Sequence, residues 1–166
     1  MNYYNEIKNK LIDNEIYSKV KDYSKERNRV LTYFEIGKLL FEAGTKYGED
    51  IIGEYSKKLV MDVNKKYNRR TLFRMKQFYI LFKDEKVSTL STQLSWSHYT
   101  ELLPINDYDK LLYYLNLSIS KCLDVRTLRE KIKSQEYERL DENAKLKLIN
   151  EETLEIKDLV PNPLII

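Results

Sequence analysis

The densest concentration of charge in the sequence lies between Lys57 and Lys76. This window holds eight basic residues and one acid, Asp62, and so carries a net charge of +7 in a chain whose total is +3. The basic residues are Lys57, Lys58, Lys65, Lys66, Arg69, Arg70, Arg74 and Lys76. Clustered cations neutralise the phosphates of nucleic acids. The window therefore predicts a surface for a polyanion, with a solvated basic helix face as the alternative.

Part of this window has the chemistry to contact base edges. Asn68 suits a helix N-cap, and the helix it opens is predicted to run from Arg69 to about Phe82. At 100° per residue, Leu72, Met75, Phe78, Tyr79 and Phe82 share one side of this helix. Arg70, Arg74 and Gln77 fall within about 60° of one another on the opposite side. A guanidinium suits guanine and an amide suits adenine, so this front predicts base readout.

Other reactive side chains form no recognisable catalytic or metal-binding pattern. His98 has no serine or cysteine nucleophile at a known spacing, and it is expected to be a packed or helix-front residue. Cys122 lies among apolar neighbours and is expected to be buried. One His and one Cys are too few for a structural zinc site, and four glycines form no phosphate-binding loop. Nuclease sites use acidic residues and a lysine, as in the triplet Glu155-Ile156-Lys157, but such triplets are common in a chain with 33% charged residues and do not indicate a site. We expect no catalytic residue, metal or cofactor.

Composition predicts a helical protein. Four glycines and three prolines among 166 residues are too few for many tight turns, while 42% hydrophobic residues are too many for a disordered chain. No apolar run approaches the roughly 20 residues of a membrane span. The start, MNYYNEIKNK, lacks the pattern of a secretory signal. We therefore expect a cytoplasmic, all-α protein.

Apolar spacing and capping residues predict the helices. In the first half, helical periods begin at Tyr4, at Ile16 and at Val30, and the last two form either separate helices or one long helix over about 16–41, with Gly44 as the expected stop. Another helix covers about 49–63. In the second half, Ser95, Asn106 or Asp107, and Asp124 are predicted N-caps. The first of these helices is expected to end near Pro104, and the last to extend toward about residue 140. Beyond Asp141 the pattern weakens, and LVPNPLII is predicted to be extended.

The helices over about 49–82, joined by the polar residues 64–68, have the proportions of a helix-turn-helix, whose second helix enters the major groove. Lys65, Lys66, Arg69 and Arg70 lie at the start of that helix and are expected to contact phosphates. Arg74 and Gln77 are expected to contact base edges. Most of the fourteen tyrosines fall on apolar faces and are expected to pack in the core rather than stack on bases.

Five segments together resemble the N-terminal domain of the YhcG family. They are YFEIGKLL, YGEDIIGEYSKKL, NRRTLFRMKQFY, QLSWSHYTELL and DVRTLREKIKSQEYERL, in matching order and spacing. The resemblance implies a helical domain with a helix-turn-helix, placed before a nuclease domain of the PD-(D/E)XK superfamily. It covers about residues 3–140, and the chain stops at Ile166, where that nuclease is expected to begin. No catalytic residue is therefore carried over.

These observations predict a compact multi-helix domain over 1–140 and an acidic tail or linker over 141–166 that leads toward a downstream domain. Its expected function is non-catalytic targeting of a YhcG-like nuclease system to duplex DNA. A nuclease domain or subunit and a second copy of the chain are further expected partners, and a membrane is not. The alternative is a helical protein-interaction or oligomerisation module, in which Trp96, Tyr99, Tyr113 and Tyr114 would be partly exposed.

Overall fold

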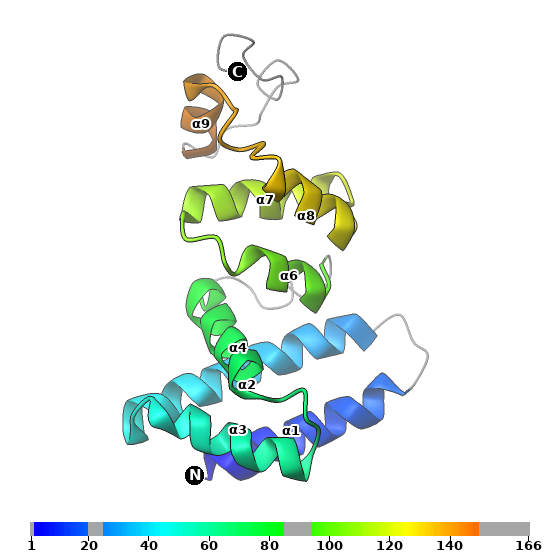
Figure 1. Cartoon of the computed structure of the whole chain (residues 1–166), viewed down its shortest axis with the longest axis vertical. Helices are drawn as coiled ribbons and strands as arrows, with labels where there is room; N and C mark the ends of the chain where they lie inside the picture. Colours follow the sequence, from blue (N-terminus) through cyan, green and yellow to red (C-terminus); the bar gives the residue numbers. More distant parts are fainter. Residues whose placement is uncertain (1, 20–24, 85–93, 150–166) are drawn as a thin grey trace. The chain divides into compact units, whose positions relative to one another are not determined.

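The computed structural model describes residues 2–19, 25–84 and 94–149, and every regular element in these ranges is an α-helix (Figure 1). The all-α fold class is confirmed. The helices are α1 (Tyr3–Ser18), α2 (Lys25–Tyr47), α3 (Asp50–Asp62), α4 (Arg69–Phe82), α6 (Trp96–Leu102), α7 (Tyr108–Ser120), α8 (Val125–Lys133) and α9 (Glu142–Ile149). None of these helices is long and apolar enough to cross a membrane.

The described residues form two compact units, and the boundary between them lies between Tyr99 and Thr100, within α6. The first unit contains α1 to α4, and the second contains α7, α8 and α9. The predicted division into a domain over 1–140 and a tail over 141–166 stays a prediction. The LVPNPLII segment and the triplet at Glu155 lie outside the described residues.

The first unit is built around α2, which packs against α1, α3 and α4. Figure 1 shows α4 crossing α2, and α3 contacts both α2 and α4. Every one of these helices contributes buried side chains to one apolar core, because each carries apolar residues at three- and four-residue spacing. The core contains Ile7, Leu11, Tyr33, Ile36, Leu39, Leu40, Ala43, Ile52, Tyr55, Leu59, Tyr67, Leu72 and Met75.

The backbones of α2 and α4 meet at Gly37. A Cβ atom at this position would lie 2.1 Å from the carbonyl oxygen of Met75 and 2.9 Å from the Cβ of Tyr79. Only glycine allows this approach without a shift of one of the two backbones. Four residues of α4 on the side toward α2 are at most 1% exposed, namely Leu72, Met75, Phe78 and Phe82. The predicted apolar face of α4 is therefore confirmed.

The predicted capping residues begin the helices as expected. The Asn68 side chain accepts a hydrogen bond from the backbone N–H of Thr71 at 3.1 Å, and α4 has the predicted bounds. Ser95 Oγ accepts from the N–H of His98 at 3.3 Å, and its hydroxyl also lies 2.7 Å from the His98 ring. Asp107 and Asp124 cap α7 and α8. The helix pair over 49–82 is confirmed, and its assignment as a DNA-binding helix-turn-helix stays a prediction.

Two predictions about the first unit are wrong. The continuous helix over 16–41 does not form, since α1 ends at Ser18 and α2 begins at Lys25. Gly44 does not stop α2, which continues to Tyr47. A Cβ at Gly44 would lie 3.6 Å from Nζ of Lys76 on α4, an ordinary contact distance, so a side chain would also fit at this position. The chain instead leaves the helix at Gly48, whose φ of +90° suits glycine.

Cys122 is exposed, contrary to the prediction that it is buried. It follows the C-terminal end of α7 with φ +49°, in the left-handed region that usually holds glycine there. The N–H groups of Cys122 and Leu123 donate to the carbonyls of Ile119 and Ser118, which is the hydrogen-bond pattern of a Schellman motif. The thiol lies on the surface because this motif, rather than the neighbouring apolar residues, determines its position.

The predicted extension of α8 toward Leu140 is also wrong. The helix ends at Lys133, because Gln135 takes a left-handed φ of +58° and the N–H of Glu136 turns back to the carbonyl of Lys131. Beyond Asp141, where the helical spacing of apolar residues is weak, the chain nevertheless forms α9. The Asp141 side chain accepts from the N–H of Ala144 at 2.8 Å and so caps this helix.

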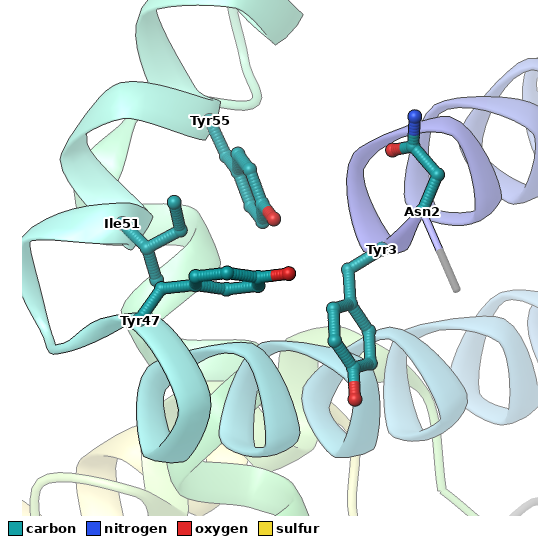
Figure 2. Close-up of a pocket in the computed structure, with 5 residues that line it drawn as sticks. All are labelled: Asn2, Tyr3, Tyr47, Ile51 and Tyr55. Carbon is teal, nitrogen blue, oxygen red and sulfur yellow. The ribbon is translucent and has the colours of Figure 1, made fainter.

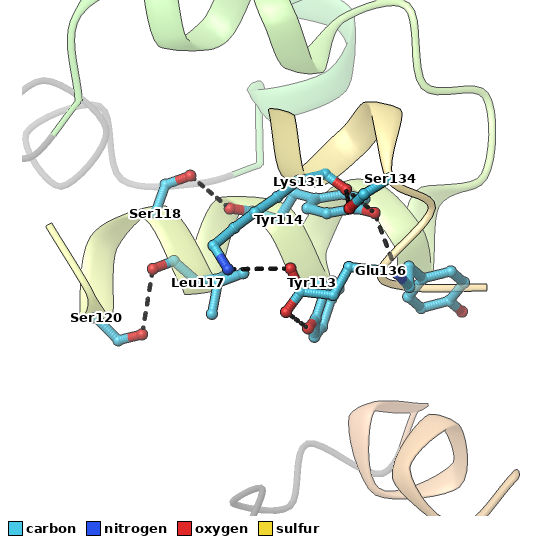
Figure 3. Close-up of polar contacts among 9 residues, drawn as sticks. Tyr113, Tyr114, Leu117, Ser118, Ser120, Lys131, Ser134 and Glu136 are labelled. Atoms are coloured by element: carbon cyan, nitrogen blue, oxygen red, sulfur yellow. Dashed lines mark hydrogen bonds and ion pairs between the residues drawn. The ribbon is translucent and has the colours of Figure 1, made fainter. Parts of the chain in front are cut away.

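In the second unit, the segment after α8 is tied to α7 by two buried tyrosines (Figure 3). The hydroxyl of Tyr114 accepts from the N–H of Tyr137 at 3.1 Å and donates to the carbonyl of Lys131 at 3.4 Å. The hydroxyl of Tyr113 donates to Glu136 at 3.0 Å, and Lys131 Nζ donates to the same carboxylate at 3.1 Å. Burial, together with the charge of Glu136 and its hydrogen bond, raises the pKa of Tyr113.

The contact at Gly37 predicts a difference between two glycine-to-alanine substitutions. Gly37→Ala should lower the free energy of unfolding by about 1 to 3 kcal/mol, because the added methyl group overlaps the α4 backbone. Gly53→Ala in α3 has nothing within 4 Å of the new Cβ and should raise it by about 0.5 to 1 kcal/mol through helix propensity. Urea denaturation of both variants measures this difference. Equal effects would contradict the backbone contact.

Candidate nucleic-acid interface

The face of α4 turned away from α2 carries the predicted site. Lys65 and Lys66 lie in the connection before α4, Arg69, Arg70 and Gln77 lie on α4, and all five are exposed. Arg74 is half-buried. Six predicted residues are thus brought to one helix and the segment that leads into it. The assignment of these residues to contacts with DNA stays a prediction.

The first half of α4 also exposes an aromatic ring that the sequence analysis left unassigned. Phe73 is 40% exposed, and Ile80, two turns further along, is 42% exposed. The guanidinium carbon of Arg69 lies 5.8 Å from the centre of the Phe73 ring, and Nζ of Lys76 lies 6.0 Å from it. These are cation–π distances. The surface therefore combines cations with an apolar ring.

The charges at the start of α4 are not cancelled by neighbouring acids. Among the described residues, no carboxylate forms an ion pair with Lys65, Arg69 or Arg70. The one acid of the basic window, Asp62, pairs instead with Lys8 of α1 at 3.7 Å and accepts a hydrogen bond from Tyr4. The positive charge of this surface is therefore available to an external anion.

Lys66 differs from the other cations because Glu15 of α1 holds it. Its Nζ lies 2.5 Å from Glu15 Oε1, and the carboxylate is largely shielded, with 25% of its side chain exposed. Lys66 also lies 5.2 Å from the centre of the Tyr67 ring. An external phosphate must compete with Glu15 for this ammonium group, so Lys66 is a weaker candidate than Lys65.

Tyr67 fixes the connection between α3 and α4 to α1. Its side chain is fully buried, and its hydroxyl donates a hydrogen bond of 2.5 Å to Glu15 Oε1. Burial, and then the bond to Glu15, raise the pKa of Tyr67, so the phenol keeps its proton. Burial alone disfavours ionised Glu15, but hydrogen bonds from Lys66 and Tyr67 outweigh it and hold its pKa below the ordinary value.

The family of the chain follows from its match to a known domain. The model of the DUF1016 N-terminal domain matches residues 9–139. The chain belongs to the DUF1016 N-terminal domain family. This confirms the resemblance to the N-terminal domain of the YhcG family. No curated protein and no solved structure matches the chain.

Three of the four aromatic residues on which the protein-interaction alternative depends are buried in this DUF1016 N-terminal domain. Tyr99, Tyr113 and Tyr114 are at most 2% exposed, contrary to the expectation that they would be available to a partner. Trp96 is partly buried, with its ring 5.0 Å from that of Tyr33 and close to perpendicular to it. The expectation fails because helical spacing places these rings in the two cores.

A second surface feature was not anticipated from the sequence. Tyr3, Tyr47 and Tyr55 line an open pocket of about 520 Å³, together with Asn2 and Ile51 (Figure 2). Its residues come from the start of α1, the end of α2 and α3. The pocket contains no charged side chain. Among the described residues, no three His, Cys, Asp or Glu side chains gather as metal ligands.

The interactions of Glu15 predict a pH-dependent contribution to stability. Glu15→Gln should lower the free energy of unfolding at pH 7 by about 1 kcal/mol, because hydrogen bonds to a charged group are stronger than those to a neutral one. The folded pKa is depressed, so this contribution is complete above the ordinary value of 4.5 and is lost as the pH falls through the folded value.

Urea denaturation of both proteins at pH 7 and at pH 3 measures this contribution, and the difference between them should shrink at pH 3. Glu35→Gln is the matched control. Glu35 pairs with Lys10 on the surface, and its loss should change stability by no more than about 0.5 kcal/mol. If the decrease in the free energy of unfolding of Glu15→Gln is the same at pH 7 and pH 3, the charge of Glu15 does not account for it.

Proposed function

We propose that this DUF1016 N-terminal domain binds duplex DNA with α3 and α4 acting as a helix-turn-helix. The observation that carries the proposal is the set of exposed cations at the start of α4, Lys65, Arg69 and Arg70, without ion pairs to any described carboxylate. A polyanion is the partner that satisfies closely spaced cations. The fixed position of the connection, held by Tyr67 on Glu15, supports a preformed surface.

The predicted residues divide into two roles. Lys65, Arg69 and Arg70 contact phosphates, assisted by the free backbone N–H groups in the first turn of α4. Arg74 and Gln77, further along α4, contact base edges in the major groove. Lys66 contributes less to phosphate binding, because a phosphate must compete with Glu15 for its ammonium group. In this proposal the domain has no catalytic residue and no cofactor, and it targets an associated nuclease domain or subunit in the cytoplasm.

A protein-interaction or oligomerisation module is the second candidate. It is favoured by α3, where Met61 is 87% exposed and Val60 is 37% exposed. Both functions are compatible in one protein, because helix-turn-helix domains often bind DNA as pairs. Light scattering together with a DNA retention assay separates them. A dimer without affinity for DNA would favour the second candidate.

The DNA-binding proposal predicts the effect of a triple variant, Lys65→Ala with Arg69→Ala and Arg70→Ala. Each phosphate contact contributes about 0.9 units to the slope of log K against log salt concentration. Loss of three contacts should therefore reduce that slope by about 2 to 3 units and weaken binding at low salt. Fluorescence anisotropy with a duplex of mixed sequence measures both quantities.

The control variant removes the same charge elsewhere. Lys121, Arg126 and Lys133 are exposed cations of the second unit, and their replacement by alanine should leave the slope within about half a unit of the unmodified chain. If both triple variants bind as the unmodified chain does, the assigned surface is wrong. If the two variants lose affinity equally, binding depends on net charge rather than on this surface.

A further inference from the structure

Contacts with phosphates do not account for Phe73. It lies on the exposed face of α4, opposite the buried residues Leu72, Met75, Phe78 and Phe82, and it is 40% exposed. An apolar ring in this position stabilises neither the core nor the contact with α2. Ile80 lies on the same face, seven residues further along, and is 42% exposed. The helix thus presents an apolar contact surface where the proposed function places DNA.

The position of Phe73 along α4 is informative. Arg69, Phe73 and Gln77 follow one another at intervals of four residues and so form a single line along the helix. The guanidinium of Arg69 lies 5.8 Å from the centre of the ring, and Nζ of Lys76 lies 6.0 Å from it. The ring is therefore placed between a cation that suits a phosphate or guanine and an amide that suits adenine.

The major groove offers such a ring one kind of apolar partner. Base edges there present hydrogen-bond donors and acceptors, and the C5 methyl group of thymine is the apolar exception. Resting on the proposed function, we propose that Phe73 is a specificity-determining residue that packs against a pyrimidine C5 methyl group in the major groove. The ligand class is duplex DNA that carries such methyl groups, first of all thymine in A·T pairs.

Charge decides between DNA and a second copy of the chain as the occupant of this face. Two copies that met through Phe73 and Ile80 would bring together two basic windows, each with a net charge of +7. Like charges in contact oppose association. Duplex DNA instead supplies negative charge to the cations and a methyl group to the ring.

The test compares the full chain on four duplexes of equal length, with alternating A–T, A–U, G–C and G–5-methylcytosine sequences. Uracil lacks only the methyl group of thymine, and 5-methylcytosine adds the same group to cytosine. We expect each methylated duplex to bind about three- to fourfold more tightly than its unmethylated counterpart, which is the effect of burying one methyl group. Anisotropy titration at fixed salt measures the four affinities.

Phe73→Ala should abolish both methyl preferences and retain the salt dependence, whereas Phe73→Leu should retain part of each preference. Tyr47→Ala is the matched control, because Tyr47 is an exposed aromatic residue of the same unit, 55% exposed, and lies outside α4. It should leave both preferences unchanged. Circular dichroism confirms that each variant is folded.

The outcomes separate the two proposals. Salt-dependent binding with equal affinity for all four duplexes overturns the role of Phe73 and leaves the proposed function standing. A methyl preference that persists in Phe73→Ala also overturns it. Failure to bind any of the four duplexes overturns the proposed function, and the inference with it.

Discussion

The direct contact between the backbones of α2 and α4 determines how the rest of the first unit is used. At Gly37 there is no side chain to separate the two helices, so the carbonyl of Met75 rests on α2. This contact commits the apolar face of α4 to the interior, and the opposite face, which begins with Arg69 and Arg70, must point outward. The exposed cations are thus a consequence of close packing on the other side of the same helix.

The acids around α1 organise the charge of this surface. Glu15 takes up Lys66, and Asp62 is occupied by Lys8 and Tyr4. Both interactions fasten the ends of the segment between α3 and α4 to α1. Because these carboxylates form their interactions there, they do not pair with Lys65, Arg69 or Arg70, whose charges stay available to an external partner. If these carboxylates lay beside the cations of α4 instead, they would reduce the positive electrostatic potential of this surface.

Local signals in the sequence were enough to predict α4 closely. A good N-cap at Asn68 and a regular apolar period determine both its bounds and its buried face. The break between α1 and α2 was missed because apolar residues continue through it at helical spacing. Cys122 and Gln135 were missed because left-handed backbone at a helix end is expected of glycine, whereas here the backbone hydrogen bonds of the helix end accompany it at other residues.

Helical spacing predicted which residues of α4 lie away from its apolar face, but it did not predict the partners of the residues around the candidate site. Helical spacing places Phe73 outside the apolar face of α4, but neither charge nor hydrogen-bonding chemistry indicates a role for its ring. The sequence pattern places Tyr67 in a polar connection, whereas the structure buries its side chain fully. Its hydrogen bond to Glu15 joins residues 52 positions apart, and no local pattern indicates which carboxylate meets which hydroxyl.

The bond between Tyr67 and Glu15 also limits how this surface can be transferred between proteins. In a peptide that contains only α3 and α4, the Tyr67 ring would be exposed to water and its hydroxyl would lose the hydrogen bond to Glu15. The apolar faces of both helices would also lose the core residues that α1 and α2 contribute. The helix pair α3 and α4 is therefore not expected to keep this structure when it is separated from α1 and α2. A gene fusion or rearrangement that carries it intact has to begin upstream of α1.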